Sequence, residues 1–277
     1  MNFRTVKIEP FGLAIEALEK GQDLRILDIN SLKKEFSGHQ LILLRGFKTF
    51  ETSTEFSDYC ESWGKVSIWP FGKVLELIEQ DNPQDHIFDH SYVPLHWDGM
   101  YRPEVAEFQI FHCVSAPLKG QGGRTTFSNT ISVLKNSSQE EKNLWEKVTG
   151  IYQRKMEFYH SRTTASIISR HPFKEYSVIR YNEPPSQEEG EFINPPDLEF
   201  TGLPKQELRE FHRTLKEALY GPKNFYAHEW QQGDVVIADN FSLLHGREKF
   251  TSKAPRHIQR VHVLSEIPFK NPGLETL

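Results

Sequence analysis

The 277-residue chain is poor in cysteine, in net charge and in long apolar runs, and each shortage excludes a class of protein. Its only cysteines are Cys60 and Cys113, which have no short pairing motif and cannot build a disulfide framework. We therefore expect two buried free thiols in a reducing compartment, the cytoplasm.

Membranes and nucleic acids are also disfavoured as partners. No stretch approaches the ~20 consecutive apolar residues of a membrane span, and no apolar run follows the first residues as in a signal peptide. The formal net charge of −5 and the pI near 6.2 give no reason to expect a nucleic acid or an acidic membrane.

Aromatic side chains are plentiful: 20 Phe, 9 Tyr and 5 Trp can fill the interior of a β-sandwich or barrel. Hydrophobic periodicity predicts strands over 41–47, 107–114, 177–182, 225–230 and 233–239, and helices over 13–18, 50–63, 137–149 and 205–220. The candidate metal ligands lie near positions 96 and 245. If they form one site, both halves of the chain must contribute to it. We therefore expect one domain, residues 1–277.

The first chemical motif is His96-Trp97-Asp98. Residues i and i+2 of a strand point to the same face, so one strand can direct an imidazole and a carboxylate at one point. His245, far along the chain, is the candidate third ligand. Two nitrogens and one carboxylate form the facial triad of non-haem Fe(II) oxygenases, which leaves coordination positions open.

Two arginines follow the third histidine. Residues 254–263 are rich in β-branched side chains and predict a strand, on which Arg256, Ile258 and Arg260 share one face. If that face lies inside a barrel, each guanidinium needs an anion there. A protein carboxylate in a structural ion pair and a ligand carboxylate gripped by the planar fork are both open.

The spacing His245, Arg256, Arg260 and the turn Gly122-Gly123-Arg124-Thr125 resemble the TauD/TfdA (taurine dioxygenase) family. That resemblance implies a mainly β fold with flanking helices, a double-stranded β-helix of the cupin-like jelly-roll type. It further implies Fe(II) on His96, Asp98 and His245, 2-oxoglutarate held by Arg256 and Thr125, and O2 as the oxidant. Retention of Asp98 disfavours a halogenase.

Three further stretches, residues 69–72, 93–101 and 237–240, resemble the dioxygenases of isonitrile natural-product biosynthesis (the PvcB/IsnB type). This closer resemblance implies a small aromatic isonitrile substrate derived from an amino acid, typically tyrosine. The implied reaction is an oxidative decarboxylation to a vinyl isonitrile, or a desaturation that keeps the carboxylate.

The expected substrate residues are Arg260 for the carboxylate and Trp69, Tyr92, Trp97 and Tyr101 around the ring. Each of these aromatics is alternatively an ordinary core side chain. Residues 153–175 carry many long polar side chains and form either a lid over the site or a solvated surface hairpin.

Three functions remain in competition. The first is isonitrile tailoring in secondary metabolism, and the second is hydroxylation of another small aromatic or amino-acid-derived substrate. The third is a non-catalytic, cupin-like metal-binding module, which would have no need of Arg256 and Thr125.

Overall fold

The computed structural model describes residues 3–156, 159–186, 192–251 and 256–277. Its largest sheet has seven strands in the order β1-β2-β3-β14-β6-β16-β4. These are β1 (Phe3–Lys7), β2 (Leu13–Ala17), β3 (Leu41–Arg45), β14 (Val235–Asp239), β6 (Glu104–Ser115), β16 (His257–Lys270) and β4 (Leu75–Ile78). All pairs are antiparallel except β2 with β3.

A second sheet has four antiparallel strands in the order β13-β7-β15-β5. These are β13 (Phe225–His228), β7 (Thr125–Asn129), β15 (Leu243–Arg247) and β5 (Val93–His96). A buried cluster that includes Phe111, Phe127, Leu243 and Ile258 joins the two sheets. Facing antiparallel sheets closed over one core form the jelly roll that the sequence predicts.

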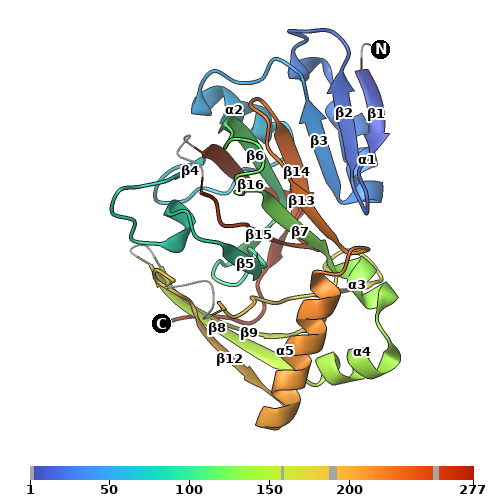
Figure 1. The fold of residues 1–277 in the computed structure, drawn as a ribbon, viewed down its shortest axis with the longest axis vertical. Helices are drawn as coiled ribbons and strands as arrows, with labels where there is room; N and C mark the ends of the chain where they lie inside the picture. The colour runs from blue at the N-terminus through green and yellow to red at the C-terminus, as the bar shows by residue number, and fades with distance from the viewer. Residues whose placement is uncertain (1–2, 157–158, 187–191, 252–255) are drawn as a thin grey trace.

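Two helices cover the other face of the seven-stranded sheet (Figure 1). They are α1 (Ile29–His39) and α2 (Ser53–Glu61), preceded by the short 3-10 helix η1 (Leu24–Ile26). Phe36 of α1 and Phe56 of α2 pack in one cluster with strand residues such as Ile42 and Val261. Thr52 caps α2 by accepting a hydrogen bond from the backbone N–H of Glu55, so the helix begins at Ser53, inside the predicted range 50–63.

The other end of the molecule holds a third layer (Figure 1). It contains the sheet β12-β8-β9-β17 and the pair β10-β11. The bounds are β12 (Asp197–Thr201), β8 (Thr149–Met156), β9 (Tyr159–Ser166), β17 (Leu274–Thr276), β10 (Ile168–Arg170) and β11 (Ser177–Ile179). Three helices flank it: α3 (Thr130–Asn136), α4 (Gln139–Glu146) and α5 (Lys205–Leu219).

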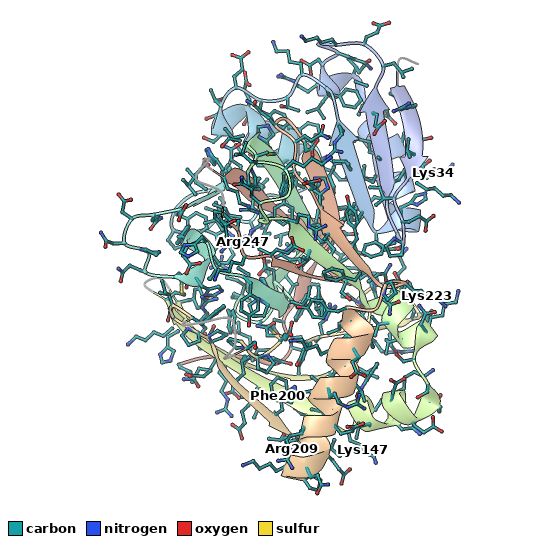
Figure 2. The ribbon with its side chains drawn as sticks, viewed as in Figure 1. Lys34, Lys147, Phe200, Arg209, Lys223 and Arg247 are labelled. Carbon is teal, nitrogen blue, oxygen red and sulfur yellow. The ribbon has the colours of Figure 1, made fainter. Side chains whose placement is uncertain are left out.

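Helix α5 packs through an apolar stripe at four-residue spacing, Phe211, Leu215 and Leu219, all fully buried. Phe200 of β12 contacts Phe211, with ring centroids 6.0 Å apart, whereas charged Arg209 lies on the periphery (Figure 2). The predicted helix over 205–220 is therefore confirmed.

The predicted helix over 13–18 is wrong. Residues 13–17 form β2, which pairs antiparallel with β1 and parallel with β3. Leu13, Ala14 and Ile15 are all buried, so both faces of the segment are covered. Strand pairing on both sides outweighs a local apolar spacing that also suits a helix.

Residues 153–175 form part of a hairpin, β8 and β9, followed by β10; residues 157–158 lie outside the described ranges. The hairpin is anchored in the sheet β12-β8-β9-β17, while Arg154, Met156 and Tyr159 at its end line a cavity that is also lined by His96 and Asp98. Of the two alternatives, a lid or a surface hairpin, the segment is a hairpin, and its end also borders the site.

Cys60 and Cys113 are buried and unpaired, as expected. Within the described ranges, no helix is both long enough and apolar enough to span a bilayer.

Candidate active site

Neighbouring strands of the sheet β13-β7-β15-β5 place His96 and His245 side by side. His245 of β15 stands opposite His96 at the end of β5, with ring centroids 4.2 Å apart. The Nδ1 of His96 is 2.8 Å from the backbone oxygen of Pro94, which turns Nε2 toward Asp98. Burial lowers the pKa of His245 well below its ordinary value, so this imidazole is neutral, the form that binds metals.

Asp98 lies on a turn just after β5, and Asn240 fixes that turn. The side-chain amide of Asn240 donates to the backbone oxygens of Asp98 and Ala106, each at 2.9 Å. In return, the indole N–H of Trp97 donates to the backbone oxygen of Asn240 at 2.7 Å. The His96–Asp98 segment is thus tied to the end of β14.

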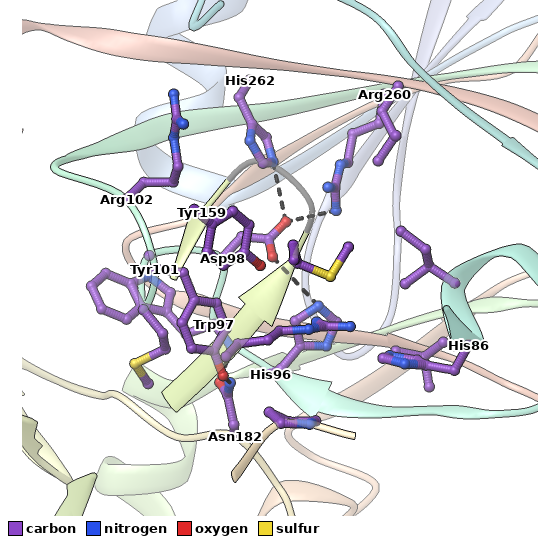
Figure 3. Close-up of a pocket in the computed structure, with 18 of the residues that line it drawn as sticks. His86, His96, Trp97, Asp98, Tyr101, Arg102, Tyr159, Asn182, Arg260 and His262 are labelled. Atoms are coloured by element: carbon purple, nitrogen blue, oxygen red, sulfur yellow. Dashed lines mark hydrogen bonds and ion pairs between the residues drawn. The ribbon is translucent and has the colours of Figure 1, made fainter. Parts of the chain in front are cut away.

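One oxygen of Asp98 accepts three hydrogen bonds. Oδ2 is 2.6 Å from Nη1 of Arg260 and 3.1 Å from Nε2 of His262 (Figure 3). It is also 2.8 Å from Nε2 of Gln109. Burial disfavours the carboxylate, yet Arg260 and the neighbouring histidines hold the pKa of Asp98 well below its usual range. Asp98 is therefore an anion, held in one orientation.

His96, Asp98 and His245 can each bring one ligand atom within 4.8 Å of the others. Oδ1 of Asp98 is 3.5 Å from Nε2 of His96, and Oδ2 is 3.7 Å from Nε2 of His245. Two imidazoles and one carboxylate converging from one side fit a divalent iron ion and leave other positions open. The structure thus brings together the three residues expected from the sequence.

Arg256, just before β16, is 4% exposed, and no carboxylate among the described residues forms an ion pair with it. Its Nε donates to the backbone oxygen of Gly123 at 3.0 Å, and one Nη is 3.3 Å from Oγ1 of Thr125. Burial lowers the pKa of Arg256 to about 9. A buried guanidinium without a protein anion fits a carboxylate ligand such as 2-oxoglutarate.

Thr125 completes that cradle. Its hydroxyl oxygen accepts from Nε1 of Trp230 at 2.9 Å and from Arg256. Both lone pairs are then used, so the hydroxyl hydrogen is available to a ligand oxygen.

A cavity of about 190 Å³ opens beside the triad. Trp69 and Tyr101, two of the aromatics expected around the substrate ring, line it. Each stacks on another lining aromatic: Trp69 on Phe71 at 5.5 Å and Tyr101 on Tyr159 at 5.9 Å. Arg260 lines it as well, beside Asp98.

Two of the aromatics expected around the substrate ring are placed differently. Trp97 borders the cavity, but its indole is 3% exposed and stacks under the guanidinium of Arg180 at 3.9 Å, so it faces the core. Tyr92 does not line the cavity. It packs on Phe192, which does line it, with ring centroids 6.0 Å apart.

Several residues of the site were not predicted from the sequence. Gln109 and His262 hold Asp98, and His262 could have been found because it lies two positions after Arg260 on the same face of β16. Gln109 is a buried amide in an apolar strand, which is a weaker signal. His86 and Arg154 also line the cavity, and Asp85 forms an ion pair with Arg154; none of the three has a recognisable spacing in the sequence.

A jelly roll with a His-Asp-His cluster between its sheets defines a class, the mononuclear non-haem iron oxygenases. Comparison with known proteins agrees with this assignment. The profile described as "Taurine catabolism dioxygenase TauD, TfdA family" matches residues 7–262.

Individual relatives match nearly the whole chain. Tyrosine isonitrile desaturase of Pseudomonas aeruginosa is 46% identical over 265 residues, covering 96% of this chain and 91% of that protein. The 3-((Z)-2-isocyanoethenyl)-1H-indole synthase of Fischerella ambigua is 40% identical, covering 95% and 96%. The solved structure of PvcB, an Fe, alpha-ketoglutarate dependent oxygenase from an isonitrile synthetic pathway, has a TM-score of 0.85 at 42% identity, covering 99% and 96%.

The chain belongs to the TauD/TfdA family. It is an Fe(II)- and 2-oxoglutarate-dependent dioxygenase, and O2 is its co-substrate.

Proposed function

We propose that the enzyme oxidises an isonitrile derived from an aromatic amino acid, of the tyrosine type, to a vinyl isonitrile in natural-product biosynthesis. The observation that carries the proposal is the aromatic-lined cavity, which holds Arg260 beside the triad carboxylate. Two relatives of 46% and 40% identity are named for a tyrosine isonitrile and for an isocyanoethenyl indole.

The triad and the cradle have separate tasks in this account. His96, Asp98 and His245 would hold iron, and Arg256 with Thr125 would hold the distal carboxylate of 2-oxoglutarate. When bound, iron and 2-oxoglutarate supply an oxidant of two electrons at the expense of O2, with succinate and CO2 as products. We assign these roles on the convergence of the three ligands and on the unmatched charge of Arg256.

Arg260 would place the substrate. Its Nη1 is engaged by Asp98, and the rest of its guanidinium lines the cavity, where it can meet the substrate carboxylate. The ring would lie against Trp69 and Tyr101, while Trp97 and Tyr92 support the wall from behind. This pose would hold the benzylic C–H bond toward His96 and Asp98, the residues that would hold the iron. Loss of two hydrogens and of CO2 from the substrate then leaves the alkene, and the hydrogens leave as water.

Hydroxylation of the same carbon is the second candidate, since the two outcomes diverge only after the first hydrogen is removed. A non-catalytic metal-binding module is set aside because the chain belongs to a dioxygenase family. The buried free thiols favour the cytoplasm as its location.

Mass spectrometry of the product tests the proposal. The protein is loaded with Fe(II), 2-oxoglutarate and tyrosine isonitrile without oxygen and then exposed to air. We expect a product lighter than the substrate by CO2 and two hydrogens. Loss of two hydrogens alone would replace the decarboxylation with a desaturation that keeps the carboxylate, and gain of one oxygen would replace it with the hydroxylation. An unchanged isonitrile alongside succinate formation would refute the substrate.

A further inference from the structure

One wall of the cavity carries a polar cluster that the reaction described above does not use. Asp85 and His86 are 1% and 4% exposed, and Arg154 of β8 reaches them from the hairpin. His86, on the short 3-10 helix η2 (His86–Phe88), lines the cavity together with Arg154. Figure 3 shows the His86 imidazole directed from η2 toward the residues around the metal site.

The hydrogen bonds of His86 determine which ring nitrogen carries the proton. Nδ1 is 3.2 Å from the backbone oxygen of Ile193 and 3.2 Å from Oδ1 of Asp85. Both partners are acceptors, so Nδ1 carries the hydrogen. Burial and the nearby charge of Arg154 lower the pKa of His86 to about 2, which keeps the ring neutral. Nε2 is therefore an acceptor, and the described residues offer it no donor.

The imidazole is held firmly. Arg247 donates to the backbone oxygens of His86 and Ile87 at 3.0 and 2.9 Å, and Phe192 stacks on the ring with centroids 4.0 Å apart. Arg247 lies two residues after His245, so one strand supplies a metal ligand and the anchor of this wall.

A donor lies beside this acceptor. Asp85 binds His86 through Oδ1, and its Oδ2 accepts from Arg154 and, at 3.0 Å, from the amide of Asn194. Arg154 is therefore fixed next to the imidazole, and its guanidinium also borders the cavity. An acceptor and a donor side by side complement a hydroxyl group, which can donate to one and accept from the other. A carboxylate here would face the lone pair of Nε2.

We propose that His86 and Arg154 bind a hydroxyl group on the far edge of the substrate's aromatic ring, and so select a hydroxyphenyl isonitrile over a phenyl isonitrile. This inference rests on the proposed function, because it places the ring in the same cavity. An indole N–H can only donate, so it satisfies His86 and leaves Arg154 unmatched. His86 and Arg154 act as specificity-determining residues and do not contact the reacting carbon.

Binding measured without oxygen separates this role from a structural one. The Fe(II)- and 2-oxoglutarate-loaded protein is titrated with tyrosine isonitrile, phenylalanine isonitrile and tryptophan isonitrile, and the dissociation constants are compared. We expect tyrosine isonitrile to bind about 10- to 100-fold more tightly than phenylalanine isonitrile, since a site built for a hydroxyl rejects the analogue that lacks it.

Two variants give the decisive comparison. In His86→Leu the dissociation constants for phenylalanine isonitrile and tyrosine isonitrile should differ by no more than about threefold. His86→Gln, whose amide oxygen can replace Nε2 as an acceptor, should recover part of the wild-type ratio of these constants. Phenylalanine isonitrile is the internal control, because a merely structural role would weaken both ligands equally and leave the ratio unchanged.

An unchanged ratio in His86→Leu would overturn the inference, as would a wild-type protein that binds phenylalanine or tryptophan isonitrile as tightly as tyrosine isonitrile. Failure of the wild-type protein to bind any of the three would instead refute the proposed function, and the inference with it.

Discussion

Single buried charges organise this site before any ligand arrives. Arg256 is buried against the backbone oxygen of Gly123 and Oγ1 of Thr125, and Asp98 is an anion surrounded by three donors. A charge in such a place is costly unless a counter-charge meets it. The protein supplies that partner for Asp98 in Arg260, whereas for Arg256 we assign it to the co-substrate.

Replacing Arg256 should therefore weaken 2-oxoglutarate binding selectively. We expect Arg256→Gln to raise the KM for 2-oxoglutarate about 10- to 100-fold, because the variant loses a charge-assisted hydrogen bond to the carboxylate. Steady-state succinate assays measure it. Arg124→Gln is the matched control: this neighbouring arginine is exposed and pairs with Glu248 at 2.7 Å, so its KM should stay within about twofold of the wild type. Equal effects of both variants would contradict the cradle.

A second residue predicts how stability depends on pH. Burial, and then the charge of Asp239, raise the pKa of Glu107 to about 7. The folded protein therefore binds a proton that the unfolded chain releases at lower pH. The stability due to neutral Glu107 is complete below about pH 4.5 and is lost as pH rises through about 7.

Glu107→Gln should remove that loss. At pH 8 we expect the free energy of unfolding to rise by about 1–2 kcal/mol, allowing for the partial exposure of Glu107. For a chain of this size this corresponds to about 3–6 °C in Tm. At pH 5 the gain should be close to zero. Thermal melts at both pH values check this, with exposed Glu266→Gln as the control. A gain of the same size at pH 5 would contradict the assignment.

Much of the site could be predicted at the residue scale because metal and carboxylate chemistry restricts residue type and spacing. His96 and Asp98 lie two positions apart, and Arg256 with the Gly122–Thr125 turn carries a family pattern. The expectation that one strand would carry both ligands is wrong, because β5 ends at His96 and Asp98 stands on the turn that follows. His86 and Arg154 could not be predicted, since their meeting depends on Asp85 and on how a distant hairpin folds back.

At the scale of elements, a glycine turn before β7 positions the backbone oxygen that Arg256 binds. Gly122 and Gly123 have φ near +79° and +75°, which an L side chain adopts only with strain. Gly122 also bridges to Phe250, and Gly123 N–H donates to the backbone oxygen of Lys249 at 3.2 Å. This close approach brings the backbone oxygen of Gly123 to Arg256.

Gly122→Ala should disturb that approach. A Cβ on Gly122 would collide with the backbone oxygen of Lys249, in addition to the strain of its positive φ. We expect a loss of about 2–4 kcal/mol in stability and a weaker 2-oxoglutarate complex. Gly120→Ala has a similar φ of +77° but open space around its Cβ, so it should cost only about 1 kcal/mol and leave the KM unchanged. Similar costs in denaturant melts of the two variants would contradict this account.

The elements were less predictable than the site. Helix α5 has a periodicity that matches its burial, and β14 is a continuous apolar run that is buried throughout, whereas residues 13–17 have an apolar spacing compatible with either structure. Their pairing with β1 and β3 decides the outcome, and pairing between distant segments cannot be read from a local pattern.

At the scale of the whole molecule, two sheets bring residues more than a hundred positions apart to one point. Strands β5 and β15 of one sheet carry the histidines, and β6 and β16 of the other hold Asp98 in place. Residues at the end of the hairpin β8–β9 then line one side of the cavity. The jelly roll could be predicted only through the family resemblance, because strand order is a property of the assembled chain.

The most direct test of the account is the stoichiometry of the coupled reaction. Succinate formed and isonitrile consumed are measured in one incubation of the Fe(II)-loaded protein with 2-oxoglutarate, O2 and tyrosine isonitrile. We predict that the isonitrile accelerates succinate formation and that the two amounts agree at one to one. Succinate formed at the same rate with and without the isonitrile, with none of it consumed, would contradict the central claim.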